Sequence, residues 1–252
     1  NAVDFGESVQ LVERDVADEV APAPTAVPPP CLVDQDRHDR EPGTADTLNV
    51  VSSDELELHV AWNRAIGASR LARAGCDGVL GRCREPHRHY HDVRHVVWVV
   101  RHVTTLLDRF EVDDPGAVIA AAFFHDAVYD PTRADNEAMS ATLAEHALTE
   151  LGWRPTRTGP VVAMINATAT HEPDSADELA TAVLLAADLA VLAAPPERYA
   201  DYVRNVRREY AHVDDDSWRR GRTAVLRRLL DRAAIFPRAL ELEPWESRAR
   251  AN

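Results

Sequence analysis

An uninterrupted apolar run, residues 117–124, leads directly into His125 and Asp126. A helix that is apolar on every side is buried on most sides, so this run predicts a helix in the core. The polar pair at its end must then lie in or beside the interior, where leaving both groups unpaired would cost several kcal/mol. A bound metal ion would satisfy both groups. The run therefore predicts a helical core that carries a metal site.

The rest of the chain predicts an all-α fold. From Ser53 onward apolar residues recur at helical spacing, and the period-two alternation of β-strands is absent from the sequence. Gly67, and then the glycines from Gly75 to Gly81, are expected to break the first helix, which begins near Asp54. Further helices are expected at residues 89–110, 117–128, 136–151, 160–170, 175–192, 196–213 and 216–236. Residues 51–252 thus predict one compact multi-helix bundle.

Residues 1–50 differ from the rest in composition. They hold 11 acidic residues and 3 arginines, with low hydrophobic density. Prolines interrupt them, among them Pro22, Pro24, Pro28, Pro29 and Pro30. Net charge with few apolar residues favours disorder. We therefore expect a disordered N-terminal tail.

Charge and cysteine content narrow the class of function. The net charge is −14, and all 28 basic residues are arginines. Such an acidic chain is a poor binder of nucleic-acid polymers, although a small phosphorylated substrate needs only a metal and a few arginines. Cys31, Cys76 and Cys83 lack metal-type spacing and predict a reduced, cytoplasmic protein. No apolar run is long enough to cross a membrane, and formation of a homo-oligomer is left open.

Other candidate ligands for the metal stand before and after the His-Asp pair. His91 and His95 are four residues apart on one face of the expected helix 89–110, and His102 lies near the same stripe. That helix would offer up to three imidazoles to the interior. Asp188 lies inside the apolar run 182–192, with little polar stripe to join. Divalent metals bind imidazole nitrogen and carboxylate oxygen from rigid elements, so His95 and Asp188 are the strongest candidates.

Three further residues have more than one interpretation. His171 follows the expected helix 160–170 and is a candidate second ligand, general acid or phosphate contact, or simply a partner of the helix dipole. Glu137 is a candidate base or support for the metal ligands, or a helix N-terminal acid. His146 lies about 120° from the centre of the buried arc of its helix, so we expect it to face solvent.

An ordered series of motifs in this chain resembles the HD-domain superfamily of metal-dependent phosphohydrolases, in particular a bacterial subgroup of predicted HD phosphohydrolases. The resemblance covers residues 62–252. The matching stretches are residues 85–91 with His95, 124–131, 135–137 with Ser140, Thr168 with His171, Asp188, 207–210, Trp218 with Arg222, and Glu246 with Arg250. A single His-Asp pair is a weak motif, whereas this ordered series is specific.

The resemblance implies a site and an activity. The metal ligands would be His95, His125, Asp126 and Asp188, holding Mn, Co, Ni, Fe or Zn, with a second metal near His171 as an option. The catalytic residues would be Asp126, His171 and Glu137, and the substrate contacts Arg88, His91, Arg207 and Arg222. The expected reaction is cleavage of phosphate from a nucleotide or other small phosphate ester by a metal-activated water.

Two alternatives to the hydrolase stay open at this point. Some HD folds hold two irons and oxidise with O₂, which needs six ligands, so His146 or His91 would have to join His171. A non-catalytic domain that binds a nucleotide as a sensor is the other alternative. The arginines also have a plain interpretation as surface ion-pair partners.

Overall fold

The computed structural model describes residues 52–172 and 179–252, and this part of the chain is helical with no β-strand. The predicted all-α class is confirmed, whereas the predicted tail, residues 1–50, lies outside the described residues. The helices are α2 (Ser53–Ala65), α3 (Arg70–Arg82), α4 (Val93–Leu107), α5 (Pro115–Phe124), α6 (Asn136–Glu150), α7 (Pro155–Thr168), α8 (Leu179–Leu189), the 3-10 helix η1 (Ala190–Ala193), α9 (Pro196–Glu209), α10 (Asp215–Asp231), the 3-10 helix η2 (Arg238–Leu240) and α11 (Glu243–Ala251).

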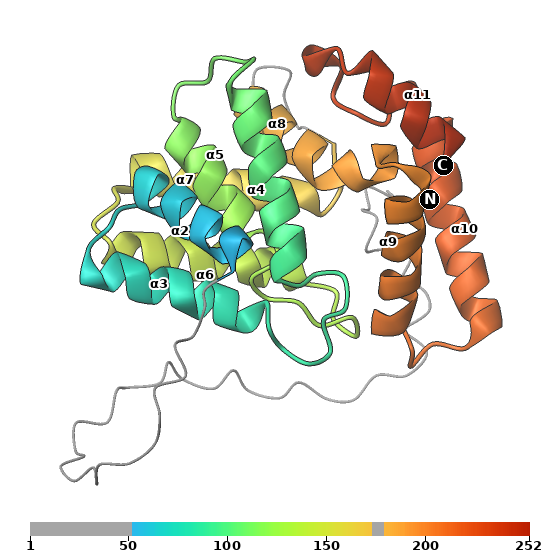
Figure 1. The fold of residues 1–252 in the computed structure, drawn as a ribbon, viewed down its shortest axis with the longest axis horizontal. Helices are drawn as coiled ribbons and strands as arrows, with labels where there is room; N and C mark the ends of the chain where they lie inside the picture. Colours follow the sequence, from blue (N-terminus) through green and yellow to red (C-terminus); the bar gives the residue numbers. More distant parts are fainter. Residues whose placement is uncertain (1–51, 173–178) are drawn as a thin grey trace, which may run out of the picture.

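The apolar helix α5 lies at the centre of the core, as its sequence predicts. It contacts α2, α4, α6, α7 and α8, and these helices surround it in Figure 1. Asp114 begins the helix by accepting a hydrogen bond from the Ala117 N–H, and Pro115 occupies its first turn. The helix ends at Phe124, earlier than the predicted residue 128, and His125 is its C-cap residue. The His-Asp pair therefore lies at the end of a buried helix.

The predicted break at residues 75–81 is wrong. Helix α3 runs through Gly75, Gly78 and Gly81 without interruption. A Cβ atom on Gly75 would lie 3.3 Å from Cζ2 of Trp62, whose side chain is buried in the core. The glycine thus lets the α3 backbone approach the Trp62 indole closely, and its role is packing rather than termination.

The start of α4 also differs from the prediction. Residues 89–92 precede the helix, which begins at Val93 with Asp92 as its N-cap, so His91 is not on α4. His102 is on α4, but its Nδ1 donates to the Trp98 carbonyl at 2.7 Å. Its ring packs against Trp98 and Trp245. Of the three imidazoles expected from one helix, α4 therefore brings only His95 to the site.

Helices α9, α10 and α11 gather on one side of the molecule, in orange to red in Figure 1. Neither η2 nor α11 is predicted from the sequence. Glu246 of α11 accepts hydrogen bonds from the Ile235 and Phe236 N–H groups. The Asn252 amide donates to the carbonyls of Leu192 and Ala194, which ties the end of the chain to η1.

The remaining helices keep their predicted places but not all of their ends. Helix α7 begins at Pro155 instead of residue 160, α9 ends at Glu209 and α10 ends at Asp231. Residues 175–178 of the expected helix 175–192 lie outside the described residues. Within the described ranges no single helix is both long and apolar enough to cross a membrane, and the pair Leu179–Ala193 and Pro196–Glu209 meets that test only together, bent by 102°.

Candidate metal centre

Three helices bring the four predicted metal ligands together. His95 lies in the first turn of α4, and its side chain is buried. His125 caps α5 and Asp126 follows it directly, so both lie where α5 ends inside the protein. Asp188 stands near the end of α8, in a helix whose other residues are mostly buried. The ends of α5 and α8 and the start of α4 thus meet at one point.

The ligand atoms of His95, His125 and Asp188 lie within 4.8 Å of one another, and Asp126 Oδ2 lies close to both imidazoles. His95 Nε2 is 3.0 Å from His125 Nε2, 3.1 Å from Asp126 Oδ2 and 3.3 Å from Asp188 Oδ1. His125 Nε2 is 3.1 Å from Asp126 Oδ2 and 3.6 Å from Asp188 Oδ1. Atoms bound at about 2.1 Å in tetrahedral or octahedral geometry lie about 3.0–3.4 Å from their neighbours. His95, His125 and Asp188 therefore fit one divalent cation, and Asp126 stands beside them as a candidate fourth ligand.

Hydrogen bonding around His125 presents the correct ring nitrogen to the centre. Its Nδ1 lies 2.9 Å from the Ala122 carbonyl, an acceptor, so Nδ1 carries the proton. In the neutral ring, the lone pair of Nε2 is then directed at the other donor atoms. A ligating imidazole is commonly oriented through its second nitrogen in this way.

The charges of the cluster favour a cation at its centre. Burial would lower the pKa of His125, but the Asp126 and Asp188 carboxylates raise it well above its ordinary value. Burial would raise the pKa of Asp126 and Asp188, but the neighbouring imidazoles hold both well below the ordinary range. The two carboxylates thus stay ionised beside the imidazoles, and a divalent metal between them would supply the same positive charge.

A small cavity of about 70 Å³ adjoins the cluster and collects three more of the predicted residues. Asp126 and Asp188 line it together with His91, His171 and Arg222. His171 has a left-handed backbone (φ 51°), and its Nε2 lies 2.8 Å from Asp188 Oδ2. Arg222 projects from α10 and donates to the Tyr202 hydroxyl. The cavity thus combines metal ligands, two imidazoles and one guanidinium.

Two of the arginines expected to contact substrate are not among the described residues that line this cavity. The Arg88 side chain is fully buried and donates to the carbonyls of Asp126 at 2.6 Å and Ala127 at 3.2 Å. Arg207 donates to carbonyls in the turn between α9 and α10, and to Asp215. Both guanidinium groups satisfy acceptors within the protein. Arg88 braces the turn that holds the metal ligands, and Arg207 braces the α9–α10 connection.

The two residues predicted on α6 are placed differently from each other. Glu137 is buried in the first turn of α6, and it is not among the described residues that line the 70 Å³ cavity. The structure therefore does not bring its carboxyl group into that cavity. The His146 side chain is 65% exposed, so the expectation that it faces solvent is confirmed.

Glu209 is a residue of the site to which the sequence assigns no role. Its Oε1 accepts hydrogen bonds from the consecutive N–H groups of His89, Tyr90 and His91, at 2.7, 2.7 and 2.9 Å. Its Oε2 lies 2.7 Å from His91 Nδ1 and accepts from the Tyr129 hydroxyl at 3.0 Å. Burial opposes ionisation, yet His91 and the N–H groups lower the pKa of Glu209 to about 2.

One signal in the sequence could have identified Glu209 as a buried acid. It falls three residues after Val206 and seven after Tyr202, so it shares the apolar face of α9 with them. An acid on such a face needs a partner in the interior. The partner itself, a loop more than a hundred residues earlier, is not visible in the pattern.

Comparison with known proteins adds no relative. No protein-family model, no curated protein and no solved structure matches this chain.

Proposed function

We propose that this protein is a metal-dependent phosphohydrolase that cleaves phosphate from a nucleotide or other small phosphate ester. The observation that carries the proposal is the group of His95, His125 and Asp188, whose ligand atoms lie close enough together for one ion. Asp126 lies beside both imidazoles, and the adjoining cavity contains Arg222. The resemblance of the motifs to the HD-domain superfamily supports the same proposal.

The cavity suits a phosphate group in size and charge. Its volume of about 70 Å³ takes a phosphate group and not a whole nucleoside, so the organic part of the ester would extend outside it. Arg222 is buried and presents a planar donor fork suited to phosphate oxygens, held by its contact with Tyr202. The guanidinium would both orient the ester and offset the charge on the phosphate.

A bound metal would act as a Lewis acid and lower the pKa of water at the site. The chain's own residues would orient the substrate and move protons around it. His171 Nε2 is held by Asp188 Oδ2 at 2.8 Å, and His91 Nδ1 by Glu209 Oε2 at 2.7 Å, so both rings have fixed orientations at the cavity wall. Imidazoles positioned in this way are suited to proton transfer at the reacting oxygens.

The donor set also favours particular metals. Two imidazoles with two carboxylates suit Mn²⁺, Co²⁺, Ni²⁺, Fe²⁺ or Zn²⁺ better than Mg²⁺, which prefers oxygen ligands and water. We therefore propose a transition metal of this group, on the basis of the donor atoms alone.

The test is phosphate release from a panel of phosphorylated metabolites by protein loaded with each of these metals. We expect Arg222→Gln to lower kcat/KM by about 100-fold, because it removes a charge-assisted contact to phosphate. Arg101→Gln is the matched control, since Arg101 pairs with Glu57 and Asp54 on the outer surface. Equal loss in both variants would contradict the role given to Arg222.

Two outcomes would replace the hydrolase with another function. Two irons per chain together with O₂ consumption would favour the oxygenase alternative, for which Asp188 Oδ2 and His171 offer the start of a second site. Recovery of intact nucleotide from the metal-loaded protein would favour a sensor domain.

A further inference from the structure

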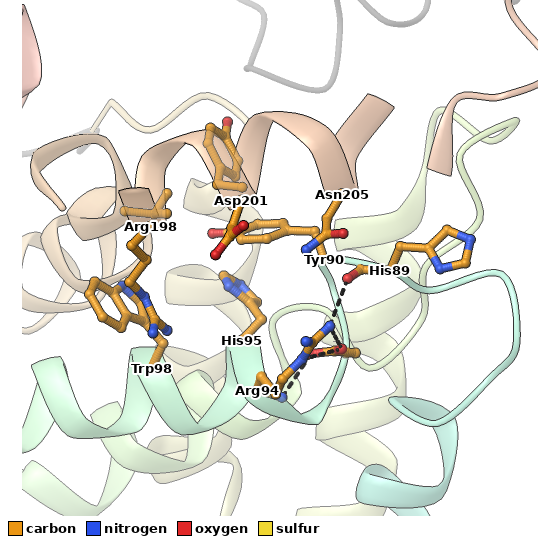
Figure 2. A pocket seen from close by; sticks show the side chains of 11 residues that line it. His89, Tyr90, Arg94, His95, Trp98, Arg198, Asp201 and Asn205 are labelled. Carbon is orange, nitrogen blue, oxygen red and sulfur yellow. Dashed lines mark hydrogen bonds and ion pairs between the residues drawn. The ribbon is translucent and has the colours of Figure 1, made fainter. Parts of the chain in front are cut away.

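A second, larger pocket lies beside the metal centre, between α4 and α9. Its volume is about 260 Å³, and His95, Trp98 and Arg94 of α4 line it opposite Arg198 and other residues of α9. Figure 2 shows these side chains facing one another across the pocket, with His95 reaching up from α4. His95 thus lies between the metal centre and this pocket. Its Nε2 faces the other candidate metal ligands, and the residue also lines the pocket.

Two residues of this wall each have a buried ring nitrogen that lacks a hydrogen-bond partner within the part of the chain that the structure describes. These nitrogens are Nδ1 of His95 and Nε1 of Trp98, whose residues are three apart on the same face of α4. When Nε2 of a histidine binds a metal, Nδ1 carries the proton, and ligating histidines almost always donate that proton to an acceptor. His125 has such an acceptor in the Ala122 carbonyl, whereas His95 has none among the described residues.

The charged groups around the pocket indicate what the acceptor would be. An indole N–H can only donate, and so can the second N–H of a ligating imidazole, so the ligand must bring acceptor atoms. The Arg198 guanidinium lies 3.8 Å from the centre of the Trp98 ring, beside these donors. The acids of the pocket are already engaged, because Asp92 accepts from Arg94 and Asp201 pairs with Arg204. The arrangement favours an anion over a neutral acceptor.

We propose that the pocket between α4 and α9 binds the carboxylate or phosphate group of a small ligand, which accepts hydrogen bonds from His95 Nδ1 and Trp98 Nε1 beside Arg198. This anion is separate from the phosphate that the proposed function places at the metal. The proposal goes beyond that function, and it concerns binding, so it does not require hydrolysis.

The site has a consequence for the metal centre. An anion that accepts a hydrogen bond from Nδ1 of His95 makes the imidazole a stronger metal ligand through Nε2. Binding of the anion and of the metal then strengthen each other, and the coupling is the same in both directions. An anionic ligand in the pocket would therefore raise the affinity of the centre for its metal through His95.

The binding test uses full-length, metal-loaded protein and calorimetric titration with acetate, inorganic phosphate and neutral acetamide at constant ionic strength. We expect acetate or phosphate to bind and acetamide not to bind, and the preferred anion identifies the ligand class. Trp98→Phe keeps the aromatic ring and removes the N–H, so Kd for the anion should rise about 10-fold. Trp218→Phe, on α10 beneath Arg207, is the matched control and should leave Kd unchanged.

Several results would overturn the proposal. They are failure of both anions to bind, binding of acetamide as tight as that of acetate, and an unchanged Kd in Trp98→Phe. An anion bound directly to the metal would give that last result, so the variant separates the two sites. Arg198→Gln is the second variant, and it should also weaken anion binding. It replaces Trp98→Phe as the test if Trp98→Phe alters the far-ultraviolet circular dichroism spectrum.

A second readout tests the coupling without activity. Metal affinity, measured by competition with a chelator, should increase with anion concentration in the wild type, and Trp98→Phe should need about 10-fold more anion for the same increase. An unchanged metal affinity in the wild type would overturn the link through His95. Because both readouts measure binding, they stand or fail independently of whether any phosphate ester is hydrolysed.

Discussion

Asp126 has two roles in one residue. Its carboxylate lies 3.1 Å from both His95 Nε2 and His125 Nε2, and its backbone carbonyl accepts from Arg88. We expect Asp126→Ala to lose the metal. The variant keeps both imidazoles but only one carboxylate, whereas two carboxylates are needed to balance the charge of a divalent ion. The helices should persist, because the substitution leaves the Arg88 contact to the backbone in place.

Metal content by mass spectrometry and helicity by circular dichroism check this prediction. His146→Ala is the control, since that side chain is exposed and should leave the metal content unchanged. Full metal retention in Asp126→Ala, or loss in His146→Ala, would contradict the assignment of the centre.

Glu209 links pH to stability. Its pKa is about 2 in the folded protein, below the ordinary 4.5. A carboxyl group with a lowered pKa stabilises the fold above its unfolded pKa, and the stabilisation is lost as pH falls toward the folded value. For Glu209 the difference corresponds to on the order of 3 kcal/mol. Glu209→Gln should therefore be less stable than the wild type at pH 6, with a gap that narrows between pH 4.5 and pH 2.

Urea unfolding at several pH values, with a chelator present to remove metal effects, measures that gap. A gap of constant size from pH 6 to pH 2.5 would show that the ionised carboxylate is not what Glu209 contributes.

At the scale of elements, the turn after α5 depends on one buried arginine. Arg88 donates to the carbonyls of Asp126, Ala127 and His91, and its side chain is fully buried. Arg88→Met would leave these carbonyls without donors, so we expect a loss of roughly 3 kcal/mol in unfolding free energy together with weaker metal binding. Chemical unfolding and chelator competition are the measurements.

Arg101→Met is the matched control for this substitution. Arg101 is half-exposed and pairs with Glu57 and Asp54, and exposed pairs contribute about 0–1 kcal/mol. If the two variants lose equal stability, Arg88 does not brace the turn.

The sequence predicts helices well where periodicity decides them and poorly where a distant partner does. The burial of α5 and the place of Asp188 in the buried helix α8 can be predicted from the sequence, because both follow directly from local composition. The start of α4 cannot be predicted in this way. Glu209, which lies on α9, accepts hydrogen bonds from the N–H groups of residues 89–91, and these residues therefore precede the helix. Nor could the sequence tell Arg222, which faces the cavity, from Arg88, which is enclosed, since only tertiary packing separates them.

For the whole molecule, the metal centre joins parts of the chain that are far apart in sequence. The ligands run from His95 to Asp188 and come from α4, the end of α5 and α8, which also pack against one another in the core. An unfolded chain cannot hold the donor atoms of His95, His125 and Asp188 at 3.0–3.6 Å from one another. A metal at this centre would therefore bind the folded state preferentially, and its binding free energy would add to the folding free energy.

Removal of the metal should consequently lower the thermal stability of the whole molecule. At a free metal concentration of about 1,000 times Kd the linkage is about 4 kcal/mol, which for a chain of this size shifts Tm by roughly 10 °C. Differential scanning calorimetry with and without a chelator measures the shift, and Asp126→Ala, which lacks a ligand, should show almost none. A wild-type Tm that is independent of metal would mean that the cluster is held by its own ion pairs, with protonated imidazoles between the carboxylates, and not by a cation.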